Sequence, residues 1–269
     1  MTAFAQHFLF EFRTGLRNKD RLLLNYLFPL GFYVMMGLLM VNINPMFQET
    51  MLPAMVVFTI LSAAILGLPS PLVEARDGGV FRSYRINGVP SLSILAIPAL
   101  TTLFHALIVS AIIALTINPL FGAPLPVDWV SFWATSLLVA LACAGLGSLI
   151  GVISSNTQVT VLWSQLIYLP SMMLSGMMVP LSLLPAGLAR AAALLPATHA
   201  MRAYAAYAYG QPVSGSALVS VLALTAGGVL ALGLAMLLFR WDSQLAERRA
   251  HPALALLALA PYAASLLFL

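Results

Sequence analysis

The chain has 269 residues, of which 61% are hydrophobic and only 7% are charged. A typical soluble domain carries about 25% charged residues, so lipid must be the solvent for most of this surface. With a single lysine, Lys19, the chain lacks a phosphate-tracking surface, and we expect no nucleic-acid partner; its single cysteine, Cys143, excludes an internal disulfide and a multi-cysteine metal site.

Residues 1–21 precede the first long apolar run. Phe8 and Phe12 stand at helical spacing, whereas Glu11 and Arg13 fall largely on the other side. This pattern predicts an amphipathic helix lying on the membrane surface, with a water-exposed extension of the first span as the alternative. Because the charges precede an apolar run that is too long for a signal-peptide core, we expect no cleavable signal.

Six apolar segments are long enough to cross a bilayer. Pro69 and Pro71 predict a break or kink at the end of the second segment. The uncharged run from Trp129 to Ala189 is too long for one crossing at about 1.5 Å per residue, and the polar stretch Ser154–Gln158 divides it. The predicted spans are roughly 22–41, 52–73, 91–117, 130–153, 159–178 and 217–239.

Prolines divide residues 179–210 into apolar pieces that are too short to cross. The pattern predicts short broken helices that enter the membrane from one side, between the fifth and sixth spans. Residues 253–269 form a last apolar run at the short limit for a crossing. We expect it to be a seventh crossing, with an apolar hairpin packed against the other spans as the alternative.

The predicted fold is therefore an all-α integral membrane protein with six transmembrane helices, in which residues 1–242 form one transmembrane domain and 243–269 a C-terminal extension. With the N-terminus inside, ten of the twelve basic residues fall in cytoplasmic segments, and only Arg190 and Arg202 lie outside. The positive-inside rule thus predicts a multi-pass protein of the cytoplasmic (inner) membrane with a cytoplasmic N-terminus.

Residues 74–90 carry five of the twenty charges and lie between two predicted spans. A charged island in this position must lie in water, and we interpret it as the contact with a soluble partner. The alternative is a solvated loop that only sets the topology.

The sequence lacks the usual signatures of an enzyme. Lys19 follows Asn18 without a glycine-rich turn, so there is no P-loop, and there is no HExxH motif or carboxylate pair. His105 in the third span is the one ionisable residue that could serve a proton-coupled carrier, although a hydrogen-bonded structural histidine is the commoner case. Gly147 and Gly151 form a GxxxG motif that packs either within one subunit or between subunits.

Two stretches resemble the ABC-2 family of ATP-binding-cassette permeases. Arg76–Pro90 is similar to the cytoplasmic loop of that family: an acidic residue, a glycine, a basic patch and a turn before the third span. Val80 and Asn87-Gly88 stand where the family usually has threonine and Thr-Pro. The second stretch, similar to the family's fifth span and external re-entrant segment, runs from Leu169-Pro170 to Arg202. The resemblance covers about residues 1–242.

The resemblance implies the membrane subunit of an ABC exporter that works as a dimer, which we expect to be a homodimer. Two separate ATPase subunits would bind ATP and Mg, so we expect no cofactor in this chain. It implies that residues 74–90 couple to the ATPase and that residues after the fifth span form an external gate. The implied coupling residues are Arg76, Asp77, Gly79, Phe81, Arg82, Tyr84 and Arg85, and the implied gate residues are Leu174, Ser175, Gly176, Pro180, Pro185 and Pro196.

Methionines near the end of the fifth span, such as Met172 and Met173, favour a hydrophobic or amphiphilic substrate: a drug, a lipid or a lipid-linked glycan. Two other functions remain open: an ion-coupled secondary carrier that uses His105, and a non-transporting membrane assembly factor.

Overall fold

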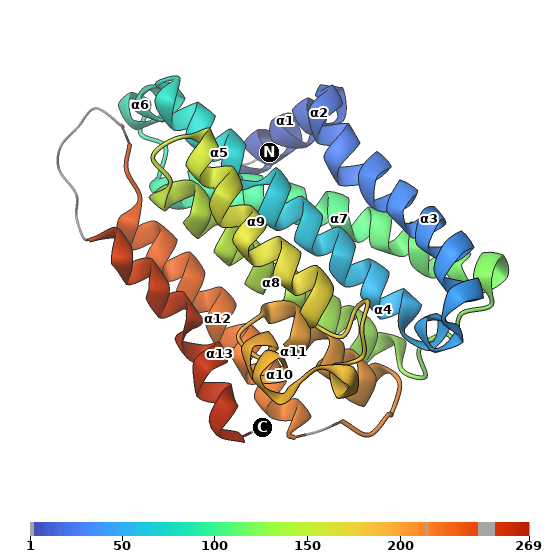
Figure 1. Cartoon of the computed structure of the whole chain (residues 1–269). Coiled ribbons are helices and arrows are strands. Elements are labelled where there is room, and N and C mark those ends of the chain that lie inside the picture. The colour runs from blue at the N-terminus through green and yellow to red at the C-terminus, as the bar shows by residue number, and fades with distance from the viewer. Residues whose placement is uncertain (1–2, 214, 242–250, 269) are drawn as a thin grey trace.

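The computed structural model describes residues 3–213, 215–241 and 251–268. These residues form a helical bundle without strands. Figure 1 shows that α1 (Ala3–Arg17), α2 (Lys19–Leu22) and α6 (Val80–Ile86) lie at one end of the bundle, and α10 (Ala186–Ala192) and α11 (Pro196–Ala203) at the other. We call the first end the basic end, because most of the described arginines and Lys19 lie there.

Within the described residues, five helical stretches are long and apolar enough to cross a membrane. They match the predicted first, second, third, fourth and sixth spans, with ends displaced by a few residues. Helix α9 (Thr157–Leu174) occupies the place of the predicted fifth span but is more polar and ends before residue 178. The exact number of crossings therefore stays a prediction. The five stretches are Leu23–Val41, Met46–Asp77, Ser91–Phe121 (α7), Trp129–Ile153 (α8) and Ala217–Leu238 (α12).

The first two stretches each contain a π-helical segment. The first is η1 (Leu23–Leu27) followed by α3 (Phe28–Ile43), and the second is α4 (Pro45–Leu61), η2 (Ser62–Gly67) and α5 (Pro69–Asp77). A proline lacks the N–H group that would continue the helical ladder, so the wider π-turn absorbs the interruption before Pro69. Of the predicted break or kink at this place, the structure has a bend at Leu68 inside one continuous helical stretch.

Glycines allow α8 to pack closely against its neighbours. A Cβ atom at Gly145 would lie 2.6 Å from the carbonyl oxygen of Gly228 in α12, and one at Gly151 would lie 3.0 Å from that of Pro69. A Cβ at Gly147 would collide with the carbonyl oxygen of Ala64 in η2. The GxxxG motif thus packs within one subunit, against the second helical stretch.

The C-terminal segment lies along α12 (Figure 1). It consists of η5 (Pro252–Leu259), α13 (Ala260–Ser265) and η6 (Leu266–Phe268). In α13 the Ser265 hydroxyl lies 3.3 Å from His199 Nε2 of α11. The ring of Tyr262 fills the space left by the missing side chain of Gly227. The segment is one continuous run of turns, and whether it crosses the membrane stays a prediction.

Candidate functional site

The charged island folds into a helical hairpin at the basic end. Helix α5 ends at Asp77, Gly78 and Gly79 form the turn, and α6 follows. Gly79 has a φ of +75°, in the left-handed region that favours glycine, and Gly88 at the second turn has a φ of +71°. The hairpin therefore joins the second stretch to α7 through two glycine turns.

The Arg76 side chain is buried and hydrogen-bonded inside the protein. It is 6% exposed, and its Nη1 and Nη2 donate to the carbonyl oxygens of Val152 and Ser155 at 3.4 and 3.3 Å. Its Nε donates to Asp77 Oδ1 at 3.1 Å. A cation at the C-terminus of a helix satisfies unpaired carbonyl groups and opposes the helix dipole, so Arg76 fastens the hairpin to the end of α8.

Phe81 and Tyr84 also face inward. Phe81 is buried, and its ring centroid lies 5.5 Å from that of Phe239, directly after α12. Tyr84 is half-buried; burial raises the pKa of its hydroxyl, and the negative charge of Glu11 raises it further. The hairpin is thus anchored on α8 and α12 and lies beside α1.

The other residues of the hairpin point outward. Asp77, Arg82 and Arg85 are exposed, and so are the apolar side chains of Val80 and Ile86, at 42% and 80%. We call Asp77, Val80, Arg82, Arg85 and Ile86 the docking face. The sequence analysis predicted the charged members of this face but missed Val80 and Ile86. Their position beside arginines in a seven-residue helix could have indicated that they are exposed.

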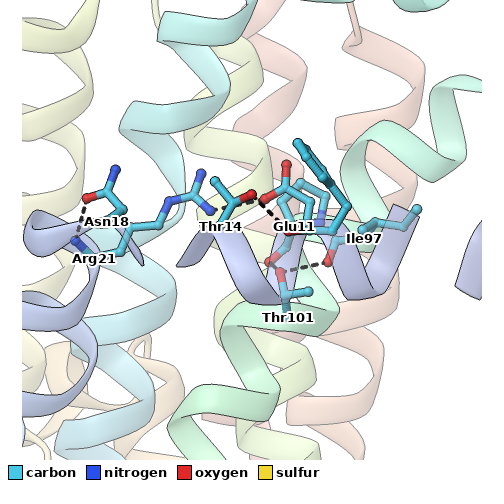
Figure 2. A network of polar contacts seen from close by, with 8 residues as sticks. Glu11, Thr14, Asn18, Arg21, Ile97 and Thr101 are labelled. Atoms are coloured by element: carbon cyan, nitrogen blue, oxygen red, sulfur yellow. Dashed lines mark hydrogen bonds and ion pairs between the residues drawn. The ribbon is translucent and has the colours of Figure 1, made fainter. Parts of the chain in front are cut away.

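An ion pair between Glu11 and Arg21 ties α1 to α2 at the basic end, among the polar contacts that Figure 2 shows. Arg21 Nη1 donates to Glu11 Oε2 at 3.1 Å, and the Arg21 backbone N–H donates to Asn18 Oδ1 at 3.0 Å. The Thr14 hydroxyl donates to the Phe10 carbonyl within α1 at 2.8 Å, and Thr101 donates to the Ile97 carbonyl of α7 at 3.0 Å. The predicted N-terminal helix is confirmed; that it lies on a membrane surface stays a prediction.

His105 connects α1 to α7. Its Nδ1 shares a hydrogen bond of 2.5 Å with the Tyr26 hydroxyl, and its ring stacks on Phe12 at 4.6 Å between centroids. Gly15 leaves room for the ring, since a Cβ there would lie 3.1 Å from His105 Nε2. These contacts give His105 a packing role, and the carrier hypothesis gains no support from them.

The predicted gate residues follow one another at the end opposite the hairpin. Leu174 is the last residue of α9, Ser175 is buried, and Gly176 turns the chain with a φ of +90°. Pro180 precedes η3 (Leu181–Leu183) and Pro185 precedes α10. The prediction of short broken helices is confirmed for this segment; entry into the membrane and gating are not tested.

Helix α11 is fixed inside the bundle, between α8 and α12. It begins at buried Pro196, and His199 Nε2 and Nδ1 lie 2.8 Å from the Ala193 carbonyl and 3.2 Å from the Ser220 hydroxyl. The Tyr204 hydroxyl lies 2.7 Å from Ser136 Oγ of α8. This part of the predicted gate is therefore a buried wedge rather than a loose loop.

The described residues contain no group of three histidine, cysteine or acidic side chains that could hold a metal ion. Cys143 is buried in α8. Two structural features stand out in the described residues: the α5–α6 hairpin with its exposed face, and buried α11 at the opposite end of the bundle.

A bundle of long apolar helices with these features is a multi-pass membrane protein. The family model described as ABC-2 type transporter matches residues 3–209, which takes in α1, the hairpin, α9 and α11. The chain belongs to the ABC-2 type transporter family, as the resemblance implied, and is a permease component without ATPase motifs of its own. A comparison with curated proteins gave no match.

Proposed function

We propose that this chain is the membrane-spanning subunit of an ABC exporter, and that a separate ATPase subunit binds its docking face. The observation that carries the proposal is the division of the hairpin into two sides. Arg76 and Phe81 hold it to the bundle, while arginines and apolar side chains face outward. Apolar anchors beside arginines are typical of protein interfaces, where charge complementarity supplies specificity.

The contacts of the hairpin suggest how a movement of the ATPase is transmitted to the membrane-spanning helices. The hairpin is continuous with the second stretch and with α7, Arg76 ties it to α8, and Phe81 packs on the end of α12. A push on α6 therefore acts on four of the five long apolar stretches. Only the stretch Leu23–Val41 has no direct tie to the hairpin through these contacts.

In this proposal the N-terminus and the basic end are cytoplasmic, as the distribution of arginines favours. Two copies of the chain, each with one ATPase, form the exporter. The segment from Leu174 to Pro196 closes the external side. The outward face of α9 carries exposed Leu162, Leu166 and Met173, which supports a hydrophobic or amphiphilic substrate passing beside it.

The test is purification of the chain from its native membrane with bound ATPase, for wild type and for the double variant Arg82→Glu with Arg85→Glu. We expect the double variant to insert normally but to lose the ATPase and ATP-driven transport, because both cations of the docking face are reversed. Arg13→Glu with Arg17→Glu is the matched control, since both residues are exposed at the basic end but lie on α1. An ATPase retained by the hairpin variant, or transport by the purified chain alone, contradicts the proposal.

A further inference from the structure

A cavity of about 410 Å³ lies at the basic end, between the start of the first span, α5 and α9. This volume falls in the range of about 300–1,000 Å³ that is usual for small-molecule sites. No residue of the docking face lines it. Its polar lining consists of Asn18, Arg21, Ser70, Glu74, Ser164 and Gln165, and leucine, valine and proline side chains make up most of the rest.

Two opposite charges line this cavity without neutralising each other. Arg21 Nη1 donates to Glu11 Oε2 (Figure 2). Its Nε and Nη2 form no hydrogen bond with a described residue. The exposed Glu74 carboxylate forms no ion pair with Arg21 or with any other described residue. A cation donor and a carboxylate acceptor are therefore both available to an occupant.

A buried acceptor adds a third requirement. Gln165 Oε1 is inaccessible to solvent and has no hydrogen-bond donor within the described residues. Ser164, next to it on α9, is also buried. Leaving such an atom unpaired is unfavourable. Because Gln165 lines the cavity, a rotation of its amide toward the cavity lets an N–H or O–H group of an occupant pair with Oε1.

Two of the three π-helical segments among the described residues, η1 and η2, contribute to the wall. Leu24 of η1 and Leu66 and Gly67 of η2 line the cavity, and η1 contacts η2. A Cβ at Gly67 would lie 3.3 Å from Asn25 Oδ1, so the two segments meet closely here. Single π-turns inside helices are frequent at functional sites.

The apolar part of the lining continues onto the outer surface of α9. Val161 lines the cavity and is 48% exposed, and Leu162 and Leu166 beside it are exposed as well. The charged residues of the lining, Arg21 and Glu74, lie at the basic end of two apolar stretches. The first stretch begins at Leu23, just after Arg21, and the second ends at Asp77, just after Glu74. This is the depth at which headgroups meet hydrocarbon chains.

We propose that this cavity binds the headgroup of a zwitterionic amphiphile that carries a primary ammonium beside a phosphate. The phosphate lies against Arg21, and the hydrocarbon chain lies along α9. The ammonium lies against Glu74 and, once the Gln165 amide has turned toward the cavity, against Gln165 Oε1. A membrane phosphatidylethanolamine has this chemistry, and so does a transported amphiphile with the same headgroup. Binding is measured on the permease alone, so its failure is distinguishable from a failure of ATPase docking.

The experiment titrates the full chain, purified in a nonionic detergent, with three short-chain lipids, and native mass spectrometry reads the occupancy. Dihexanoyl-phosphatidylethanolamine carries ammonium N–H donors, the phosphatidylcholine is a zwitterion without them, and the phosphatidylglycerol lacks the cation. We expect the ethanolamine lipid to bind about tenfold more tightly than either of the others, the size of one charge-assisted hydrogen bond. Equal binding of the three lipids overturns the proposal.

Two variants test the residues directly. Gln165→Leu and Glu74→Gln should each weaken binding of the ethanolamine lipid by about tenfold. Gln158→Leu and Glu49→Gln are the matched controls, because both residues are exposed and lie outside the cavity. If both cavity variants unfold at the wild-type temperature and bind the ethanolamine lipid as tightly as wild type, the proposal is wrong.

A single-chain alkyl phosphoethanolamine separates the two sources. Binding of this probe as tight as that of the diacyl lipid identifies the headgroup alone as the ligand and fits a transported amphiphile. Binding of the diacyl lipid alone fits a resident membrane lipid. Both results support the site, and binding of neither probe overturns it.

Discussion

Replacing Gly147 with alanine tests the packing of α8 against the second helical stretch. In an unobstructed helix, glycine to alanine stabilises by about 1 kcal/mol. At Gly147 the new Cβ would collide with the carbonyl oxygen of Ala64, and it would lie 3.1 Å from the carbonyl carbon and 3.5 Å from Leu68 Cδ2. Because the obstacle is backbone in a buried segment, we take the upper end of the usual overpacking penalty, about 3 kcal/mol.

The expected net effect of Gly147→Ala is a loss of about 2 kcal/mol of unfolding free energy. For a chain of this size the loss corresponds to a fall of about 4–8 °C in the unfolding temperature. The control is Gly233→Ala in α12, where no atom lies within 4 Å of the new Cβ, and it should raise the temperature by about 2–4 °C.

Thermal unfolding of both variants in the same detergent, followed by tryptophan fluorescence, measures the difference. If Gly147→Ala is as stable as Gly233→Ala, the close approach of α8 to η2 is wrong, and so is the assignment of the GxxxG motif to packing within one subunit.

Three further changes test other contacts. Arg76→Ala should lower the unfolding free energy by about 2 kcal/mol, because the charged hydrogen bonds to the end of α8 are lost, whereas exposed Arg85→Ala should leave it unchanged. Tyr204→Phe should cost about 1 kcal/mol through the lost hydrogen bond to Ser136, measured by the same unfolding assay. Asp128 caps α8; hydrogen bonds, first from the Ser131 side chain, lower its pKa below the ordinary 3.8. The ionised carboxylate therefore stabilises the fold above that ordinary pKa value, and this effect is lost as the pH falls through the folded-state pKa. The difference in unfolding temperature between wild type and Asp128→Asn, measured across a pH series, should vanish in acid.

The long apolar runs predicted the long helices because twenty or so uncharged residues have few other solutions in lipid. The prolines at 180, 185 and 196 likewise predicted short helices. Helix α9 departs from that rule, since Ser164, Tyr168 and Ser171 face the bundle and lower its hydropathy. Mean hydropathy alone does not predict that the polar residues of α9 lie on one face and are buried against the other helices.

The hairpin shows a different limit. Its charges predicted a surface segment, and Asp77, Arg82 and Arg85 are exposed. No local pattern could tell that Arg76 would meet the carbonyl groups that end α8, 76 residues further along the chain. Sequence distance also hid the pairing of Phe81 with Phe239. The cavity at Arg21 and Gln165 depends on three segments meeting, and no single motif announces it.

Site-specific photocrosslinking from the docking face tests the central claim most directly. Benzoylphenylalanine is placed at the position of Ile86 and, in a second protein, at that of Leu183. Leu183 is 71% exposed and lies in η3, shortly before α10, which is at the opposite end of the bundle. In cells that contain the intact transporter, the first position should crosslink to an ATPase subunit and the second should not. A crosslink to the ATPase from the second position, or none from the first while the complex hydrolyses ATP, would contradict the account.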